Sequence, residues 1–180
     1  ICIPDDLMVS SESVFAAYPI SARIQGVETI FTKMTPDCRF DVKAMLDEIK
    51  RNPRVKLVAI PNPNNPTGTY IPDSELIPFL AAVEKIRDGS VHVILDYAYW
   101  DYVTAKDMTD PIVLYRRFSN VSVLKTFSKI YGLGGLRVGS ISPDTSDIFQ
   151  EGIIIPPTKL IDAGVTNEAT LKIFFRNSRF

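Results

Sequence analysis

Short apolar runs rich in β-branched residues recur along this chain, and between them apolar residues return with a helical period. Such runs predict buried strands. They cover Val27–Met34, Val55–Ile60, Val91–Leu95, Val121–Leu124 and Leu136–Ile141, and Ile1–Ile3 is a shorter candidate.

Three segments predict helices. Asp41–Lys50 carries its apolar residues on one face, as does a segment from Asp73 or Ser74 to about Arg87. A further helix is expected from Ser13, an N-cap residue, to about Gln25, where Gly26 ends it. Pro19 lies inside this helix, so we expect a kink or a break there.

Strands and helices that alternate in this order indicate an α/β fold of three layers around a mostly parallel sheet. In such sheets ligands bind beyond the carboxyl ends of the strands. Three polar clusters follow predicted strands: the rigid loop PNPNNPTG (Pro61–Gly68), the segment Asp96–Tyr99, and the segment Thr126–Lys129. We therefore expect them to meet at one edge of the sheet.

Composition excludes some classes of protein. Of the 180 residues 46% are hydrophobic, and the net charge of −1 provides no basic surface for nucleic acid or an anionic membrane. No apolar run reaches the length of a membrane span. Cys2 and Cys38 form no motif, so we expect a cytoplasmic protein without a metal site. The chain opens at Ile1 in the middle of a pattern, which suggests a fragment.

The segment around Lys129 combines a reactive amine with features of an anion site. A lysine that loses its proton can form a Schiff base with a carbonyl group. Thr126 and Ser128 offer hydroxyl groups, and the glycine-rich turn and Arg137 offer N–H donors that suit a phosphate. A surface lysine after a strand is the alternative reading.

Asp96 stands at the end of a predicted strand, where it is either a cap or a ligand for a cation. A carboxylate in this place suits the protonated ring nitrogen of pyridoxal phosphate. Tyr99 and Asn65 could reach other polar atoms of the same ligand, although Asn65 could also bond its own turn. His92 lies among valines, and we interpret it as structural.

Three motifs then occur in order: PNPNNPTG, Asp-x-Ala-Tyr at Asp96–Tyr99, and Thr-Phe-Ser-Lys-x-x-Gly-Leu-x-Gly-Leu-Arg-Val-Gly from Thr126. Together they resemble the fold-type I pyridoxal-phosphate enzymes, class I/II aminotransferases, and most of all the histidinol-phosphate aminotransferase branch. The resemblance covers about residues 1–141 and implies a partial large, cofactor-binding domain.

The resemblance implies roles on the ring side of the cofactor. Lys129 would form the Schiff base and move the substrate proton, and Asp96 would pair with the ring nitrogen. Phe15 would stack on the ring, because SVFAAY is similar to the family's Pro-Thr-Tyr-x-x-Tyr, with Ser13 and Val14 in place of the first two residues.

The resemblance also implies how the remaining polar atoms of pyridoxal 5′-phosphate are bound. Asn65 and Tyr99 would hydrogen-bond the phenolic oxygen. Thr126, Ser128 and Arg137 would hold the phosphate. The family's Asp-Glu-Ala-Tyr has a tyrosine in place of the glutamate here, which leaves the roles of Asp96 and Tyr99 intact.

The function implied is transfer of an amino group from a small-molecule amino donor to a 2-oxo acid, in a homodimer. The family's N-terminal glycine-rich loop and its small domain with the carboxylate-binding arginine do not occur in this sequence, so we expect weak activity or none. The alternatives are a decarboxylase or lyase of the same fold, or a non-catalytic truncated or fused chain.

Residues 142–180 are expected to have a different origin. Ser146–Arg179 resembles a piece of the hydantoinase B family and predicts a loop followed by a helix at Glu168–Phe175. We expect a junction near Pro143 and assign no catalytic role to this tail.

Overall fold

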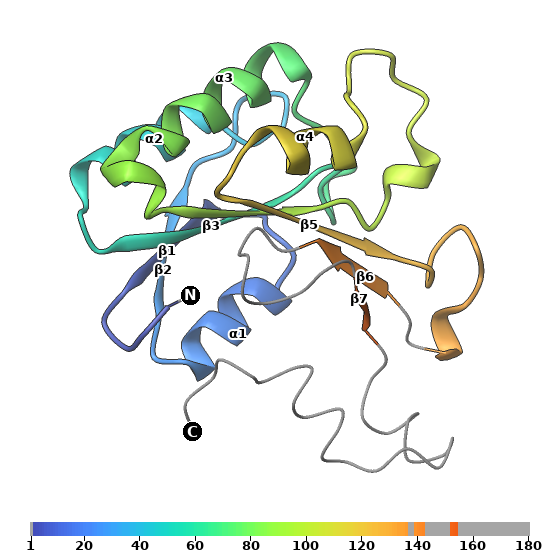
Figure 1. Ribbon diagram of the computed structural model, residues 1–180, viewed down its shortest axis with the longest axis horizontal. Helices are drawn as coiled ribbons and strands as arrows, with labels where there is room; N and C mark the ends of the chain where they lie inside the picture. The colour runs from blue at the N-terminus through green and yellow to red at the C-terminus, as the bar shows by residue number, and fades with distance from the viewer. Residues whose placement is uncertain (1, 137–138, 143–151, 155–180) are drawn as a thin grey trace.

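The computed structural model describes residues 2–136, 139–142 and 152–154. Its centre is a seven-stranded sheet in the order β2-β1-β3-β4-β5-β6-β7 (Figure 1). The strands are β1 (Leu7–Ser11), β2 (Glu28–Thr32), β3 (Val55–Pro61), β4 (His92–Asp96), β5 (Val121–Thr126), β6 (Gly139–Ser142) and β7 (Gly152–Ile154). The first five are parallel, whereas β6 runs antiparallel to β5 and β7 antiparallel to β6.

Helices cover both faces of this sheet. Their bounds are α1 (Ala17–Ile24), α2 (Val42–Arg51), α3 (Asp73–Glu84) and α4 (Pro111–Arg117), and three short 3₁₀ helices cover Ile86–Gly89, Trp100–Tyr102 and Gly134–Leu136. In Figure 1, α2, α3 and α4 lie on one face and α1 lies on the other. The α/β class and the mostly parallel sheet are confirmed.

The main core lies between the sheet and the layer of α2, α3 and α4. Val93 and Leu95 of β4 are fully buried there, whereas their neighbours His92 and Ile94 point to the other face and are half-buried. This alternation is the two-residue period of a strand. A smaller cluster of Met8, Ala22, Val27 and Ala59 lies on the side of α1.

The first strand was assigned to the wrong residues. Ile3 is exposed outside any strand, and β1 is Leu7–Ser11 instead. Two serines at its end hide the strand pattern, but both are buried because their hydroxyl groups donate to backbone carbonyls. Ser10 bonds the carbonyl of Ala59 at 2.7 Å, and Ser11 bonds that of Thr32 at 3.3 Å.

The first helix also differs from the prediction. It begins after Ala16 rather than Ser13, and no side chain caps it. Pro19 lies in its first turn, where the missing N–H has no partner in the helix, so the helix does not break there. Gly26 follows its end with φ of +73°, as the prediction of a glycine stop requires.

The described elements α4 and β7 are among those that were not predicted. α4 begins at Pro111, whose preceding Asp110 accepts a hydrogen bond from the N–H of Ile112. β7 lies within the tail that was expected to begin as a loop, and the helix expected at Glu168–Phe175 lies outside the described residues. Among the described helices, none has the length and apolar character to cross a membrane.

Candidate functional site

The candidate site lies at the carboxyl ends of β3, β4 and β5, as the sheet topology predicts. Pro61, the last residue of β3, lies level with Asp96, the last residue of β4, and Asp96 lies level with Leu124 of β5. The chain leaves each strand here into one of the three polar clusters.

These clusters form one small pocket of about 60 Å³. Its lining includes five of the eight predicted site residues, which are Phe15, Asn65, Asp96, Tyr99 and Lys129. They come from four segments that are far apart in the sequence. The other lining residues, Pro61, Pro63 and Ala98, are apolar.

Both carboxylate oxygens of Asp96 accept hydrogen bonds. The N–H of Ala98 donates to Oδ1 at 2.9 Å, and the hydroxyl of Tyr18 donates to Oδ2 at 2.6 Å. Burial, together with the charge of Asp96, raises the pKa of Tyr18 far above its ordinary value. Tyr18 therefore remains a protonated donor. Sequence reasoning missed this residue, although it is the last position of the motif that pointed to Phe15.

Lys129 is exposed beyond the end of β5, and its Nζ lies 5.0 Å from the centre of the Tyr99 ring. This distance allows a cation–π contact. Among the described residues, no carboxylate lies within ion-pair distance of Lys129. The amine is therefore not committed to a salt bridge there.

The turn that carries Lys129 is held by local hydrogen bonds. The N–H of Gly132 bonds the carbonyl of Lys129 at 3.0 Å, and that of Leu133 bonds the carbonyl of Phe127 at 3.1 Å. The N–H of Ser128 bonds Oγ1 of Thr126 at 3.1 Å. Thr126 and Ser128 are half-buried beside Lys129, whereas Arg137, the third predicted phosphate ligand, lies outside the described residues.

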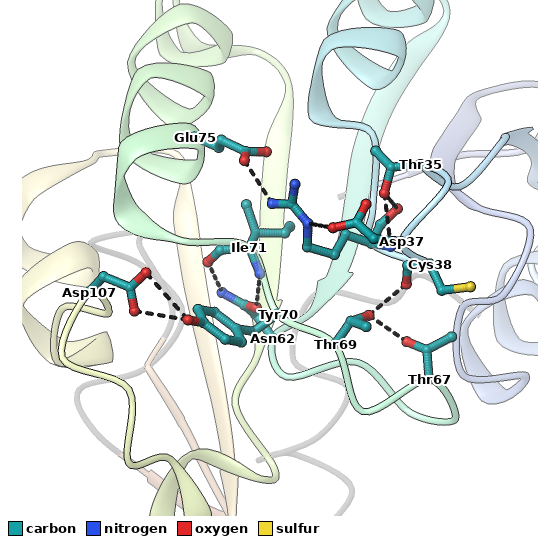
Figure 2. Close-up of polar contacts among 11 residues, drawn as sticks. Thr35, Asp37, Cys38, Asn62, Thr67, Thr69, Tyr70, Ile71, Glu75 and Asp107 are labelled. Atoms are coloured by element: carbon teal, nitrogen blue, oxygen red, sulfur yellow. Dashed lines mark hydrogen bonds and ion pairs between the residues drawn. The ribbon is translucent and has the colours of Figure 1, made fainter.

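The loop that carries Asn65 is braced by bonds from its own side chains, and from Thr69 just after it, to backbone groups outside the loop (Figure 2). Asn62 is buried and bonds the backbone of Ile71 twice, donating to its carbonyl at 3.1 Å and accepting from its N–H at 2.8 Å. Thr69 donates to the carbonyl of Cys38 at 2.6 Å. Asn64 donates to the carbonyl of Ser13 at 3.1 Å, which ties the loop to the segment before α1.

Asn65 itself makes no side-chain hydrogen bond to another described residue and is half-buried in the pocket lining. The alternative that it bonds its own turn is therefore not what the structure shows. In the segment between β2 and α2, Arg39 forms ion pairs with Asp37 at 2.5 Å and Glu75 at 2.7 Å. These contacts support the scaffold and do not reach the pocket.

A second pocket of about 490 Å³ adjoins the first and was not predicted. The two share Pro63, Asn65 and Tyr99, and the second extends along Tyr102 and Met108. No described lining residue of the second pocket carries a charge.

His92 lies away from both pockets, near the amino end of β4. Its Nε2 is 2.8 Å from Oγ of Ser122 on β5. Burial lowers the pKa of His92 to about 4. A neutral ring bonded to a neighbouring strand agrees with the structural interpretation.

The sequence and the fold match one family of known proteins. The sequence model of the family described as aminotransferase class I and II matches residues 1–160. The chain therefore belongs to the class I and II aminotransferases. This match extends beyond residue 141, where the resemblance was expected to end.

The most similar relatives include histidinol-phosphate aminotransferases from Staphylococcus carnosus and Staphylococcus aureus. Each is 40% identical over 154 residues, which are 86% of this chain and 42% of the relative. The chain thus spans less than half the length of the curated relatives it matches.

Solved structures of aminotransferases are similar to this fold. The histidinol-phosphate aminotransferase from Sinorhizobium meliloti in complex with pyridoxal-5′-phosphate has a TM-score of 0.71 and 26% identity, over 79% of this chain and 37% of that one. An aminotransferase from Mycobacterium tuberculosis has a TM-score of 0.67 and 25% identity, over 80% of this chain and 38% of that one.

Proposed function

We propose that this chain carries the cofactor-binding part of a pyridoxal-phosphate-dependent aminotransferase of the histidinol-phosphate type. One observation carries the proposal: Phe15, Asn65, Asp96, Tyr99 and Lys129, chosen from sequence motifs, line a single pocket. The family match and the relatives' names support the same function.

The chemistry of the pocket fits pyridoxal phosphate. Asp96 offers a carboxylate for the cationic ring nitrogen, and each of its oxygens keeps room for a further hydrogen bond beyond the one it accepts. Asn65 offers an unpaired amide to the phenolic oxygen, with Tyr99 beside it. Phe15 is 44% exposed and forms an aromatic wall against which the ring can stack.

The bound cofactor would act as an electron sink for the substrate amino acid. The residues of this chain bind and orient it and move a proton. Asp96 would keep the ring nitrogen protonated, and Lys129 Nζ would hold the aldehyde and carry the substrate proton. Thr126, Ser128 and Arg137 are proposed to bind the phosphate.

The partners proposed for the whole protein are an amino donor and a 2-oxo acid, in a cytoplasmic homodimer. The division of the chain into residues 1–141 and a tail of different origin stays a prediction, as does weak or absent turnover by this chain alone.

Covalent trapping tests the proposal. The chain is mixed with pyridoxal phosphate, reduced with borohydride and digested, and the modified peptide is identified by mass spectrometry. We expect an absorbance band near the edge of the visible range before reduction, and a pyridoxyl group on Lys129 afterwards.

The matched control is Lys106→Ala, which removes an exposed lysine outside the pocket lining and should leave labelling unchanged. Lys129→Ala should abolish both the band and the label. Equal labelling of Lys129→Ala and the unaltered chain would exclude the proposed role of Lys129.

A further inference from the structure

Tyr18 joins the helix on one face of the sheet to the carboxylate at the sheet's edge. It lies in the first turn of α1, and its hydroxyl reaches Oδ2 of Asp96 at 2.6 Å. α1 lies on the face opposite α2, α3 and α4 (Figure 1). Asp96 therefore receives a side-chain contact from an element far away in the sequence.

This contact determines how the carboxylate can turn. The N–H of Ala98 holds Oδ1, and Tyr18 holds Oδ2, so the two bonds together restrict rotation of the carboxylate about its Cβ–Cγ bond. A carboxylate held through one oxygen alone would keep that freedom. Hydrogen bonds to a charged group are also among the stronger ones in proteins.

The same turn of α1 supports the aromatic wall of the pocket. The Phe15 and Tyr18 rings meet edge to face, with their centres 6.4 Å apart and their planes at 80°. The N–H of Tyr18 also bonds the carbonyl of Phe15 at 3.1 Å. One short segment thus places the ring wall and the donor to Asp96 together.

We propose that Tyr18 is a positioning residue for Asp96: its hydroxyl holds the carboxylate in the orientation that receives the ring nitrogen of the cofactor. This inference rests on the function proposed above. It differs from a purely packing role, in which the Tyr18 ring fills space between α1 and the sheet and its hydroxyl does not affect the cofactor.

The variant Tyr18→Phe separates the two roles, because it keeps the ring and removes only the hydroxyl. Binding is followed by the fluorescence of Trp100, the single tryptophan of the chain, which follows Tyr99. Two ligands are compared: pyridoxal phosphate, and its 1-deaza analogue, in which a C–H group replaces the ring nitrogen.

We expect Tyr18→Phe to weaken binding of pyridoxal phosphate about 10-fold, as loss of a hydrogen bond to a charged group predicts. Binding of the deaza analogue should change less than about twofold, because that ligand has no nitrogen for Asp96 to meet. Equal weakening for both ligands, or no weakening for either, overturns the proposal.

Tyr70→Phe is the matched control, since it removes a different tyrosine–aspartate hydrogen bond, from Tyr70 to Asp107 at 3.0 Å. It should leave the ratio of the two affinities unchanged. If the unaltered chain binds neither ligand, the proposed function fails and this inference fails with it. Binding of both ligands with an unchanged ratio in Tyr18→Phe overturns the inference alone.

Circular dichroism checks that Tyr18→Phe folds. If it does not, the unaltered chain labelled with ¹³C at the tyrosine Cζ provides the same comparison. The Cζ signal of Tyr18 should move more with pyridoxal phosphate than with the deaza analogue. Equal movement with both ligands overturns the proposal.

Discussion

The loop that carries Asn65 and the turn that carries Lys129 line the same pocket, but different kinds of contact hold them. Buried side chains of the loop itself bond backbone groups outside it, above all Asn62 with its two bonds to Ile71. Local bonds between near neighbours hold the turn. Three apolar side chains of the turn are at least 40% exposed, namely Ile130, Tyr131 and Leu133.

This difference indicates that the contacts that stabilise the site and its reactive lysine lie in different segments. Rigid placement suits Asn65, because an amide that recognises a ligand atom loses affinity when it moves. In the proposed function Lys129 changes its bonding during the reaction, and an exposed side chain on a locally held turn can do so. We therefore expect substitutions in the loop and in the turn to have different effects on the stability of the fold.

The largest effect is expected from Asn62→Ala. The substitution leaves the buried N–H and carbonyl of Ile71 without partners, so the free energy of unfolding should fall by about 2–4 kcal/mol. Urea unfolding measures the change. Asn65→Ala is the control in the same loop, and it should change stability by less than about 0.5 kcal/mol. Similar losses in both variants would contradict the distinction between bracing and ligand-facing residues.

A smaller effect on stability is expected from substitution of His92, whose bond to Ser122 joins β4 to β5. An ordinary histidine titrates near pH 6.5, whereas burial lowers the pKa of His92 to about 4. Between these values the unfolded chain binds a proton that the folded chain does not, so stability falls as the pH falls. Above about pH 6.5 this penalty is absent.

His92→Gln should remove this part of the acid sensitivity, which we expect to be about 2–3 kcal/mol between pH 6.5 and pH 4. Unfolding in urea at several pH values measures it. An equally steep loss in the variant and the unaltered chain would show that other groups cause the acid dependence. Because the chain has one histidine, its ring signal also reports the pKa directly by NMR.

The smallest effect is expected at Gly132, which has a φ of +66° in the turn after Lys129. Among the described residues an alanine Cβ there meets no atom within 4 Å, so Gly132→Ala should cost only the conformational strain, about 1 kcal/mol. Labelling of Lys129 by pyridoxal phosphate should also fall. Gly135→Ala is the control, because Gly135 has no positive φ and no atom of the described residues lies within 4 Å of a Cβ added there. Equal changes in both variants would mean that the turn does not depend on the glycine conformation.

Sequence reasoning predicted elements with a clear local period. The strands at Val55–Pro61 and His92–Asp96 and the helix α2, which Asp41 caps, lie within a few residues of their predicted bounds. In each case the apolar residues that form the pattern are those that the fold buries. Prediction failed for β1, because its terminal serines look polar and become buried only through bonds to other strands.

For the site, too, sequence reasoning predicted some residues and missed others. The motifs identified the residues from Asn65 to Lys129 because each lies next to a strand end, and parallel strand ends meet at one edge of a sheet. They did not reveal the bond from Tyr18 to Asp96. These residues are 78 positions apart, and nothing local to either one indicates the other.

By itself the sequence determined the α/β class and the chemistry of the cluster around Lys129, because strand periods and reactive side chains are local properties. Only the tertiary structure decided which residues surround Asp96, and it added Tyr18 to them. It also decided that Asn65 is free to meet a ligand while its neighbours Asn62 and Asn64 brace the loop. Those roles depend on contacts between distant segments, which form only when the sheet and its helices pack together.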